Sequence, residues 1–287
     1  MKNTLVSVTY YLALAIACLC INCTRGKVYH SPKGYDLNNP VKYNMPEDLH
    51  EISGIAFHNR NADTLFAEQD EDGELFYLKP GSYNLQSIKF GKNGDYEDLA
   101  ISNKQVIMLR SDGVLFTFPF SDIRNTETTS TQKWENLLPA GKYEGMFADD
   151  NNKLVYVLCK HCSTDKSTKS NNGYILKLLD NGALEKAGHF SIDLKKIEEP
   201  TGIKKITFHP SGLSRNPLSN EWYIISSVNK LLVVADSNWQ LKEVFDLNPS
   251  RFNRPEGITF DRDNNLYISN EGDKVQPGNV LKFAYKK

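Results

Sequence analysis

A short unit recurs along this chain of 287 residues: a polar turn, an apolar strand, an Asp/Asn-rich turn and a second apolar strand. Aligning the copies at the polar residue that opens the first strand gives spacings of 44, 47, 67 and 45 residues between Ser53, Glu97, Glu144, Ser211 and Glu256. A repeat of roughly 40–50 residues made of short strands is typical of β-propellers, in which each repeat is one four-stranded blade. The repeat therefore predicts an all-β propeller.

The number of blades follows from the number of first strands, which is five. The interval from Glu144 to Ser211 is longer than the others, so six blades is the alternative. We attribute the excess to a polar loop at residues 163–172 and a short helical turn at residues 194–200. A lone strand near Tyr43 precedes the first repeat, and the last repeat stops at the strand containing Phe283. Pairing of these two segments is expected to close the ring and remove its open sheet edges.

The N-terminus differs in composition from the repeats. Residues 1–23 have Lys2 followed by an apolar run, which is typical of a cleaved signal peptide. Cys18 follows a lipobox-like Ala-Ile-Ala, and Cys23 is the competing lipidation site. We expect an exported protein that is anchored by lipid to a bacterial membrane and faces the periplasm or the exterior. Residues 24–40 are interpreted as a tether, and residues 41–287 as a single propeller domain.

The overall charge bears on the choice of partner. Lys and Arg total 34 and Asp and Glu total 35, which gives a formal net charge of −1. A nucleic-acid binder would show a basic face or stripe, so no nucleic-acid partner is expected.

Carboxylates occupy three of the five aligned positions, namely Glu97, Glu144 and Glu256. Propellers place ligand sites at the mouth of the central channel, where these residues should meet. A ring of carboxylates is costly unless it is protonated, paired or neutralised by a cation, and hard oxygen ligands suit Ca²⁺. These three glutamates are therefore candidate metal ligands. The alternative is that each accepts backbone N–H groups from the neighbouring blade and only holds the ring together.

Further candidate ligand-binding residues lie at the starts of the first strands or at the ends of the second strands. They are Glu51, Ser53, Glu68, Arg110, Lys160, Ser211, Asn270 and Glu271. Arg110 and Lys160 are cations that would either offset the acidic ring or grip an anionic group such as phosphate.

The segment Cys159-Lys160-His161-Cys162 is a lone C-x-x-C pair. Without a second pair a four-cysteine zinc site is disfavoured, and in an exported protein Cys159 and Cys162 are expected to form a disulfide. Nucleophile elbows, phosphate-binding loops and dinucleotide fingerprints are absent from the sequence, so no catalytic residues are assigned.

Several of these segments together resemble the SdiA-regulated propeller proteins. The resemblance spans roughly residues 41–285 and rests on Glu51-Ile52-Ser53-Gly54-Ile55, Gly94-Asp95-Tyr96-Glu97-Asp98-Leu99-Ala100, Tyr143-Glu144-Gly145, Pro210-Ser211-Gly212 and Pro255-Glu256-Gly257-Ile258. It implies a cell-envelope propeller with a bound Ca²⁺, and it implies no reaction.

Two classes of function remain. The favoured hypothesis is a binding module that recognises a small ligand or an envelope partner at the channel mouth. The alternative is a metal-dependent hydrolase acting on a phosphoester, with Glu97, Glu144 and Glu256 around Ca²⁺ and Arg110 or Lys160 facing the phosphate.

Overall fold

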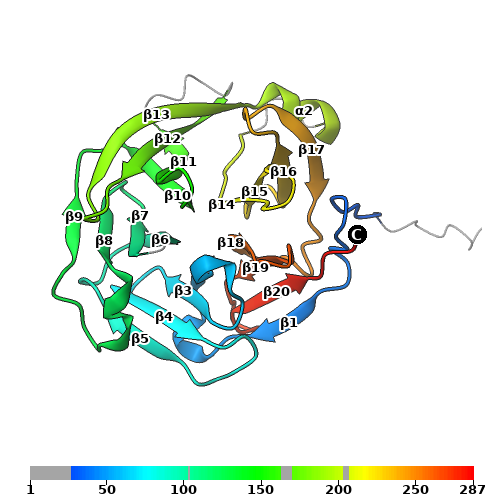
Figure 1. Cartoon of the computed structure of the whole chain (residues 1–287). Helices are drawn as coiled ribbons and strands as arrows, with labels where there is room; N and C mark the ends of the chain where they lie inside the picture. Colours follow the sequence, from blue (N-terminus) through cyan, green and yellow to red (C-terminus); the bar gives the residue numbers. More distant parts are fainter. Residues whose placement is uncertain (1–26, 103, 163–169, 203–206) are drawn as a thin grey trace, which may run out of the picture.

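The computed structural model describes residues 27–102, 104–162, 170–202 and 207–287, which form a ring around a central opening (Figure 1). The ring consists of five antiparallel sheets of four strands each, so the prediction of five blades is confirmed and six is wrong. No helix within the described ranges is long and apolar enough to span a membrane.

The strands follow one pattern from the channel outwards, and we number the blades 1 to 5 from the sheet that begins with β2. The inner strands are β2 (Ile52–Ala56), β6 (Tyr96–Ser102), β10 (Gly141–Asp149), β14 (Gly212–Arg215) and β18 (Pro255–Phe260). The second strands are β3 (Leu65–Gln69), β7 (Gln105–Arg110), β11 (Leu154–Cys162), β15 (Trp222–Ser226) and β19 (Leu266–Asn270). The third strands are β4 (Glu74–Leu78), β8 (Leu115–Pro119), β12 (Ser170–Leu178), β16 (Leu231–Ala235) and β20 (Asn279–Phe283). The outer strands are β5 (Gln86–Lys89), β9 (Gln132–Trp134), β13 (Leu184–Asp193), β17 (Leu241–Asp246) and β1 (Val41–Asn44).

The ring closes where the first and last strands meet. β1 pairs antiparallel with β20, and Tyr43 lies opposite Val280. The N-terminal strand therefore completes blade 5, as predicted. It covers the edge of β20 that would otherwise be unpaired.

The helices among the described residues are few and short. The chain has the 3₁₀ turns η1 (Glu47–Leu49), η2 (His58–Arg60) and η3 (Phe120–Arg124) and the helix α2 (Lys195–Thr201). The helix α2 matches the helical turn expected at residues 194–200 and lies at the rim of the ring in Figure 1.

The hydrophobic core lies between the blades rather than inside any one of them. Each pair of neighbouring blades shares one cluster of buried side chains, because alternate residues of every strand point towards the next sheet. Burial of apolar surface at these five seams is the main term that holds the ring together.

Close approach of the inner strands depends on glycine at one aligned position. Gly54, Gly145, Gly212 and Gly257 each follow the residue that opens the repeat. A Cβ on Gly257 would come within 2.5 Å of the carbonyl oxygen of Ser53 in the neighbouring blade. Blade 2 has Asp98 at this position instead of glycine.

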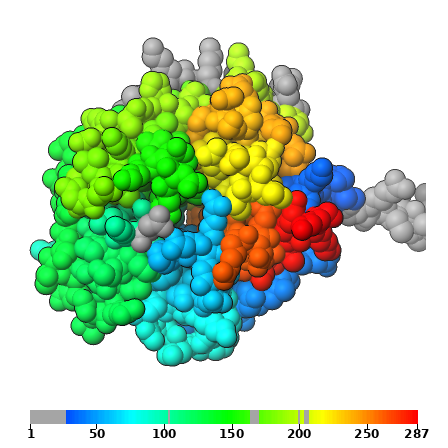
Figure 2. Space-filling view, in the orientation of Figure 1, coloured from blue at the N-terminus to red at the C-terminus, as the bar shows by residue number. Residues whose placement is uncertain are grey.

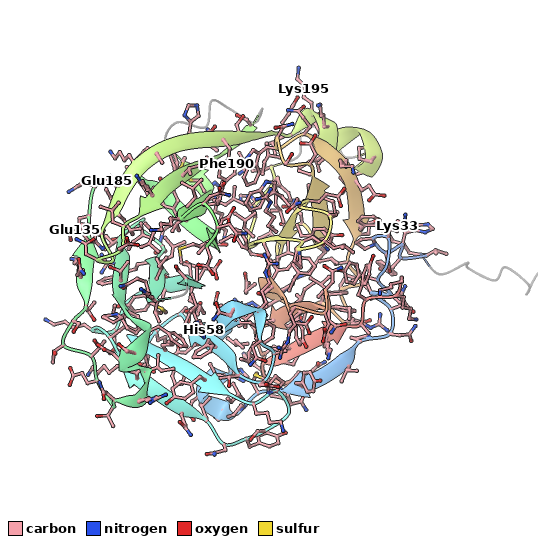
Figure 3. All side chains as sticks on the ribbon, viewed as in Figure 1. Lys33, His58, Glu135, Glu185, Phe190 and Lys195 are labelled. Atoms are coloured by element: carbon pink, nitrogen blue, oxygen red, sulfur yellow. A yellow bond between two sulfur atoms is a disulfide. The ribbon has the colours of Figure 1, made fainter. Side chains whose placement is uncertain are left out.

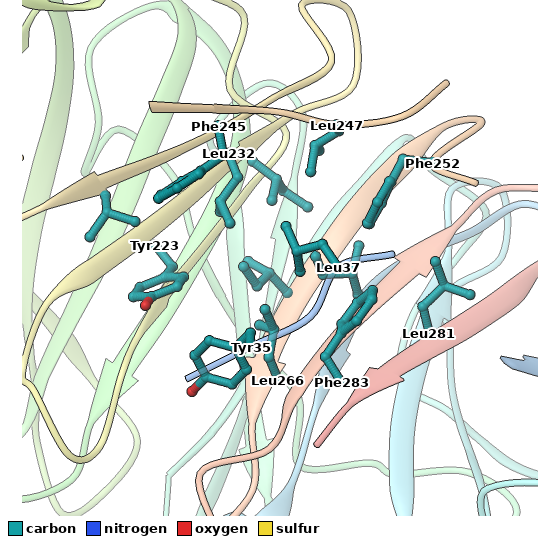
Figure 4. Packing of buried hydrophobic residues seen from close by; sticks show 14 of the residues in the cluster. Tyr35, Leu37, Tyr223, Leu232, Phe245, Leu247, Phe252, Leu266, Leu281 and Phe283 are labelled. Carbon is teal, nitrogen blue, oxygen red and sulfur yellow. The ribbon is translucent and has the colours of Figure 1, made fainter. Parts of the chain in front are cut away.

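The segment predicted to be a tether is in part a component of the domain. Tyr35 is 7% exposed and Leu37 is 3% exposed, and both pack in the cluster between blades 4 and 5 beside Phe283 (Figure 4). The Tyr35 hydroxyl donates to the Asn264 carbonyl oxygen at 2.8 Å and accepts from Asn216 Nδ2 at 3.0 Å. The interpretation of this stretch as a tether was wrong for these two residues. The surrounding Pro, Gly and Asn residues are typical of a loop and gave no sign that Tyr35 and Leu37 are buried.

The predicted signal peptide and the lipidation sites Cys18 and Cys23 lie outside the described residues.

Candidate functional site: an acidic channel mouth

The residues that open the repeats gather at one end of the channel. Backbone irregularities place them there, because the pairing of inner and second strands shifts register at Tyr96/Asp98, Tyr143/Gly145 and Pro255/Ile258. Glu97, Glu144 and Glu256 lie within these bulges, and a bulge turns its extra residue away from the ladder. We call the end of the channel formed by these glutamates, Glu68, Lys160 and Glu271 the acidic mouth.

Glu144 forms the tightest contact of the acidic mouth. Its side chain is 10% exposed and its Oε1 accepts from Lys160 Nζ, an ion pair across β10 and β11. Burial raises the pKa of Glu144 to about 7, although Lys160 acts in the opposite direction. Burial disfavours the charged form of Lys160, but Glu144, Glu256 and Glu97 together keep its pKa raised. Lys160 is therefore the cation that three carboxylates of the mouth share.

Glu97 has the most strongly shifted carboxyl group of the three. Burial and then the nearby charges of Glu144 and Asp95 raise its pKa to about 10, and Lys160 offsets this only in part. Glu97 is therefore protonated at neutral pH. No ion pair links its side chain to a described residue.

Glu256 and Glu271 occupy the blade 5 side of the mouth. Burial raises the pKa of Glu256, and a hydrogen bond with Ser227 and the charge of Lys160 oppose this. Glu271 is ion-paired with Arg254, and burial still raises its pKa to about 7. The same carboxylates that the repeat aligned are thus brought together with only a partial complement of positive charge.

Glu68, at the end of β3, lies deepest. The residue is 0% exposed, and Oε1 accepts the backbone N–H of Gly54 at 2.6 Å. Its other oxygen, Oε2, is buried without a hydrogen-bond partner among the described residues. Burial raises the pKa of Glu68 to about 8, with smaller contributions from Asp70 and Glu256. Asn270 lies in the equivalent blade 5 strand, where Nδ2 donates to Asn279 Oδ1 at 3.2 Å.

Two predicted ligand-binding residues instead link neighbouring blades. The Ser53 hydroxyl donates to the Glu97 carbonyl oxygen at 3.1 Å, and the Ser211 hydroxyl donates to the Pro255 carbonyl oxygen at 2.7 Å. Their hydroxyl groups therefore hold the seams between inner strands.

Arg110 is engaged within its own hairpin. Nε and Nη2 donate to the two carboxylate oxygens of Asp112 at 2.9 and 2.7 Å, and the guanidinium lies 5.8 Å from the centre of the Phe116 ring. This fork-to-fork pair occupies the donors that would face a phosphate. Glu51 is half-buried before β2, and its charge acts on Asp70 and Glu271.

Asp98 links two blades by accepting backbone N–H groups, which is the alternative role that the sequence suggested for the ring glutamates. Its Oδ1 accepts from the N–H of Leu99 at 2.8 Å and its Oδ2 from the N–H of Met146, in blade 3, at 2.6 Å. Sequence reasoning did not single out this residue. The available signal was an aspartate at the position where the other four repeats have glycine.

Cys159 and Cys162 form a disulfide with a Cα–Cα distance of 5.9 Å, and Lys160 lies between them. His161 meets His209 edge-to-face, with 4.4 Å between ring centres. Burial lowers the pKa of His209, and His161 and Lys160 add to the effect. The cation on this side of the mouth is therefore Lys160, since the lowered pKa of His209 favours its neutral form.

The fit of the mouth to Ca²⁺ can be judged from the donor set. Among the residues that the structure describes, no three His, Cys, Asp or Glu side chains are grouped so that they could hold a metal ion. Lys160 instead supplies a charge close to Glu144. The carboxylates as they lie therefore do not form a ready-made Ca²⁺ site.

Known proteins of similar fold place this ring among the propellers. A crystal structure of luciferin-regenerating enzyme is similar with a TM-score of 0.54 and 10% identity, over 86% of this chain and 95% of that one. Glutaminyl cyclase from Myxococcus xanthus is similar with a TM-score of 0.53 and 13% identity, over 86% of this chain and 96% of that one. At such identity the likeness extends to the fold alone.

By sequence, no curated protein matches this chain. Residues 184–274, from β13 to just beyond β19, match the model of the SdiA-regulated family. With the five-bladed ring, this match confirms the resemblance to the SdiA-regulated propellers that the sequence motifs showed.

Proposed function

We propose that this chain is a binding module of the cell envelope whose acidic mouth receives a positively charged group of a small ligand or partner. The observation that carries the proposal is Glu97, a buried carboxyl group near the charges of Glu144 and Asp95 that forms no ion pair with a described residue. A cation arriving at the mouth would allow Glu97 to ionise and would relieve the repulsion within the ring.

An ammonium group fits this mouth better than a metal ion. The Lys160 ammonium, which is paired with Glu144 and acted on by Glu97 and Glu256, is the internal precedent that supports this choice. Ca²⁺ is the second cation to test, because the family resemblance suggested it and carboxylate oxygens are its usual ligands.

The phosphoester hydrolase has less support. The hypothesis required Arg110 or Lys160 to face a phosphate, but Asp112 engages Arg110 and Glu144 engages Lys160. A mouth rich in carboxylates also repels a phosphate dianion.

Thermal unfolding at pH 8 with added putrescine or CaCl₂ tests the proposal. A cation that binds only the folded protein stabilises it by RT ln(1 + [L]/Kd), which is about 2.7 kcal/mol at a hundredfold excess over Kd. We expect the midpoint to rise with putrescine, and the rise to shrink in Glu97→Gln. Glu185→Gln, a matched change at the outer edge of the ring (Figure 3), should respond like the wild type. A midpoint that neither cation moves would refute the proposal.

The location at the envelope is a separate part of the proposal. It rests on the apolar N-terminal segment and on Cys18 and Cys23. Metabolic labelling with a fatty acid should mark the wild-type protein, and either Cys18→Ser or Cys23→Ser should abolish the label. An unlabelled wild-type protein would contradict lipid anchoring.

A further inference from the structure

A cavity lies at the other end of the channel, where the inner strands end. It has a volume of about 550 Å³ and is lined by residues of all five blades. Figure 2 shows the molecule hollowed at the centre of the ring. Pockets of this size hold small molecules. We call this end the opposite mouth, and none of the residues aligned at the acidic mouth lines it.

One wall of the opposite mouth is a strained turn. Asn59 and Arg60, in η2, both have left-handed backbones, with φ values of 50° and 56°. Two successive non-glycine residues in this region are costly, and such strain persists only where the surroundings enforce it.

Contacts with blades 5 and 2 enforce this conformation. The N–H of Arg262 donates to the Arg60 carbonyl oxygen at 2.9 Å, and Nη2 of Arg262 donates to Asn61 Oδ1 at 2.9 Å. On the other side, the His58 ring stacks on Phe120 with 3.9 Å between centres. Figure 3 shows His58 on the inner side of the ring. The turn is thus clamped between two blades with Asn59 and Arg60 lining the cavity.

Arg60 brings an uncompensated charge to the opposite mouth. It is exposed and forms no ion pair with any residue that the structure describes. The second arginine of the lining, Arg215, is ion-paired with Asp149 at 3.3 Å and lies 5.3 Å from the Trp222 ring centre.

The other wall contains the carboxylates of Asp149 and Asp150, and the oxygens of Asp149 are already engaged as acceptors. Asp149 accepts from the backbone N–H groups of Asn151 and Asn152, from Asn152 Nδ2 at 2.8 Å and from Arg215. The lining also contains Asn220, beside Arg215. The donors that the cavity offers to a ligand are the Arg60 guanidinium and the side-chain amides of Asn151 and Asn220.

We propose that the opposite mouth binds a small polyoxygenated anion, with a carboxylate or phosphate group held by Arg60. A guanidinium matches the two oxygens of such a group, and the contacts of the turn fix the backbone from which Arg60 extends. The side-chain amides of Asn151 and Asn220, which also line the cavity, would bind the remaining oxygens.

Calorimetric titration of the full chain with citrate and with inorganic phosphate, at low ionic strength, tests this site. We expect at least one of the two anions to bind, and Arg60→Gln to weaken its binding tenfold or more. Arg60→Lys keeps the charge but loses the planar guanidinium. It should bind the anion more weakly than the wild type and more tightly than Arg60→Gln. Arg124→Gln, an equal change of charge on the exposed η3, should leave binding within twofold of the wild type.

Two further measurements keep this test separate from folding and from the acidic mouth. Arg60→Gly should keep or raise the thermal midpoint while losing anion binding, because glycine relieves the left-handed strain. Glu97→Gln should leave anion binding unchanged. If neither anion binds the wild type, if glucose binds as well as citrate does, or if Arg60→Gln binds like the wild type, the proposal is wrong.

Discussion

At the starts of the five inner strands the channel is ringed by glutamates, whereas at their ends it is lined by two arginines, several asparagines and two aspartates, one of them paired with Arg215. The same strands build both mouths, so the difference comes from what surrounds each end. At the starts, backbone bulges turn Glu97, Glu144 and Glu256 out of the ladders, and the ends of second strands add Glu68 and Lys160. At the other end, tight turns such as η2 supply the lining. The two ends of one channel thus differ in chemistry although the same strands form both.

The largest effect should come from a carboxylate that is not part of either mouth. Asp98→Ala leaves the N–H groups of Leu99 and Met146 without an acceptor between blades 2 and 3. We expect a loss of about 3 kcal/mol in the free energy of unfolding. Urea denaturation measures it, with the exposed Asp63→Ala as control. A loss no larger than that of the control would mean that Asp98 does not stabilise the contact between blades 2 and 3. The distinction between a structural Asp98 and a channel-facing Glu97 would then be wrong.

Removal of the shared cation should have the next largest effect. Lys160→Met leaves the Glu144 carboxylate buried without its partner. We expect a loss of about 2 kcal/mol at pH 8, and a smaller loss at pH 5, where Glu144 is protonated in the folded protein. Added putrescine should restore part of the midpoint at pH 8. Equal losses at both pH values would show that Lys160 contributes packing rather than charge.

Neutralising the unpaired carboxyl group should instead stabilise the protein. The folded pKa values of Glu97, Glu68 and Glu144 are raised to about 10, 8 and 7, so the folded protein keeps protons that the unfolded chain releases near its ordinary value of 4.5. Stability is therefore fully present below about pH 4.5 and is lost as the pH rises towards 10. Glu97→Gln should raise the free energy of unfolding by about 1–2 kcal/mol at pH 8 and leave it unchanged at pH 4. Thermal melts across this range measure the difference, and a gain that does not grow with pH would contradict the prediction.

The smallest effect concerns the opposite mouth. Arg60→Gly removes a left-handed non-glycine residue, and we expect a gain of about 0.5 kcal/mol after the greater flexibility of the unfolded chain is counted. Arg60→Ala, which keeps the strain, should show no gain in the same melts. If both variants unfold at the same midpoint, the left-handed backbone of Arg60 is not strained. A strained turn would then not distinguish the opposite mouth from the acidic mouth.

Much of the fold was predictable because a repeat reports architecture directly. The five first strands, the outer strands and the pairing of Tyr43 with the last blade all follow from spacing and alternation. The convergence of Glu97, Glu144 and Glu256 was also predictable, since equivalent positions of a ring face one axis. The side-chain partners were not predictable, because they depend on side-chain directions that spacing does not encode. Examples are the ion pair of Lys160 with Glu144, the ion pair of Arg110 with Asp112 and the burial of Tyr35. The opposite mouth escaped notice because its turns differ from blade to blade.

Carbon-13 NMR titration of the glutamate side-chain carboxyl groups, with Glu97 assigned through Glu97→Gln, tests the central claim most directly. If the acidic mouth is a receptor short of positive charge, the Glu97 carboxyl should titrate near pH 10 in the unliganded protein. Its pKa should fall when putrescine or Ca²⁺ is added, because a bound cation favours the ionised form. A Glu97 carboxyl that titrates near 4.5, with or without these cations, would contradict the account.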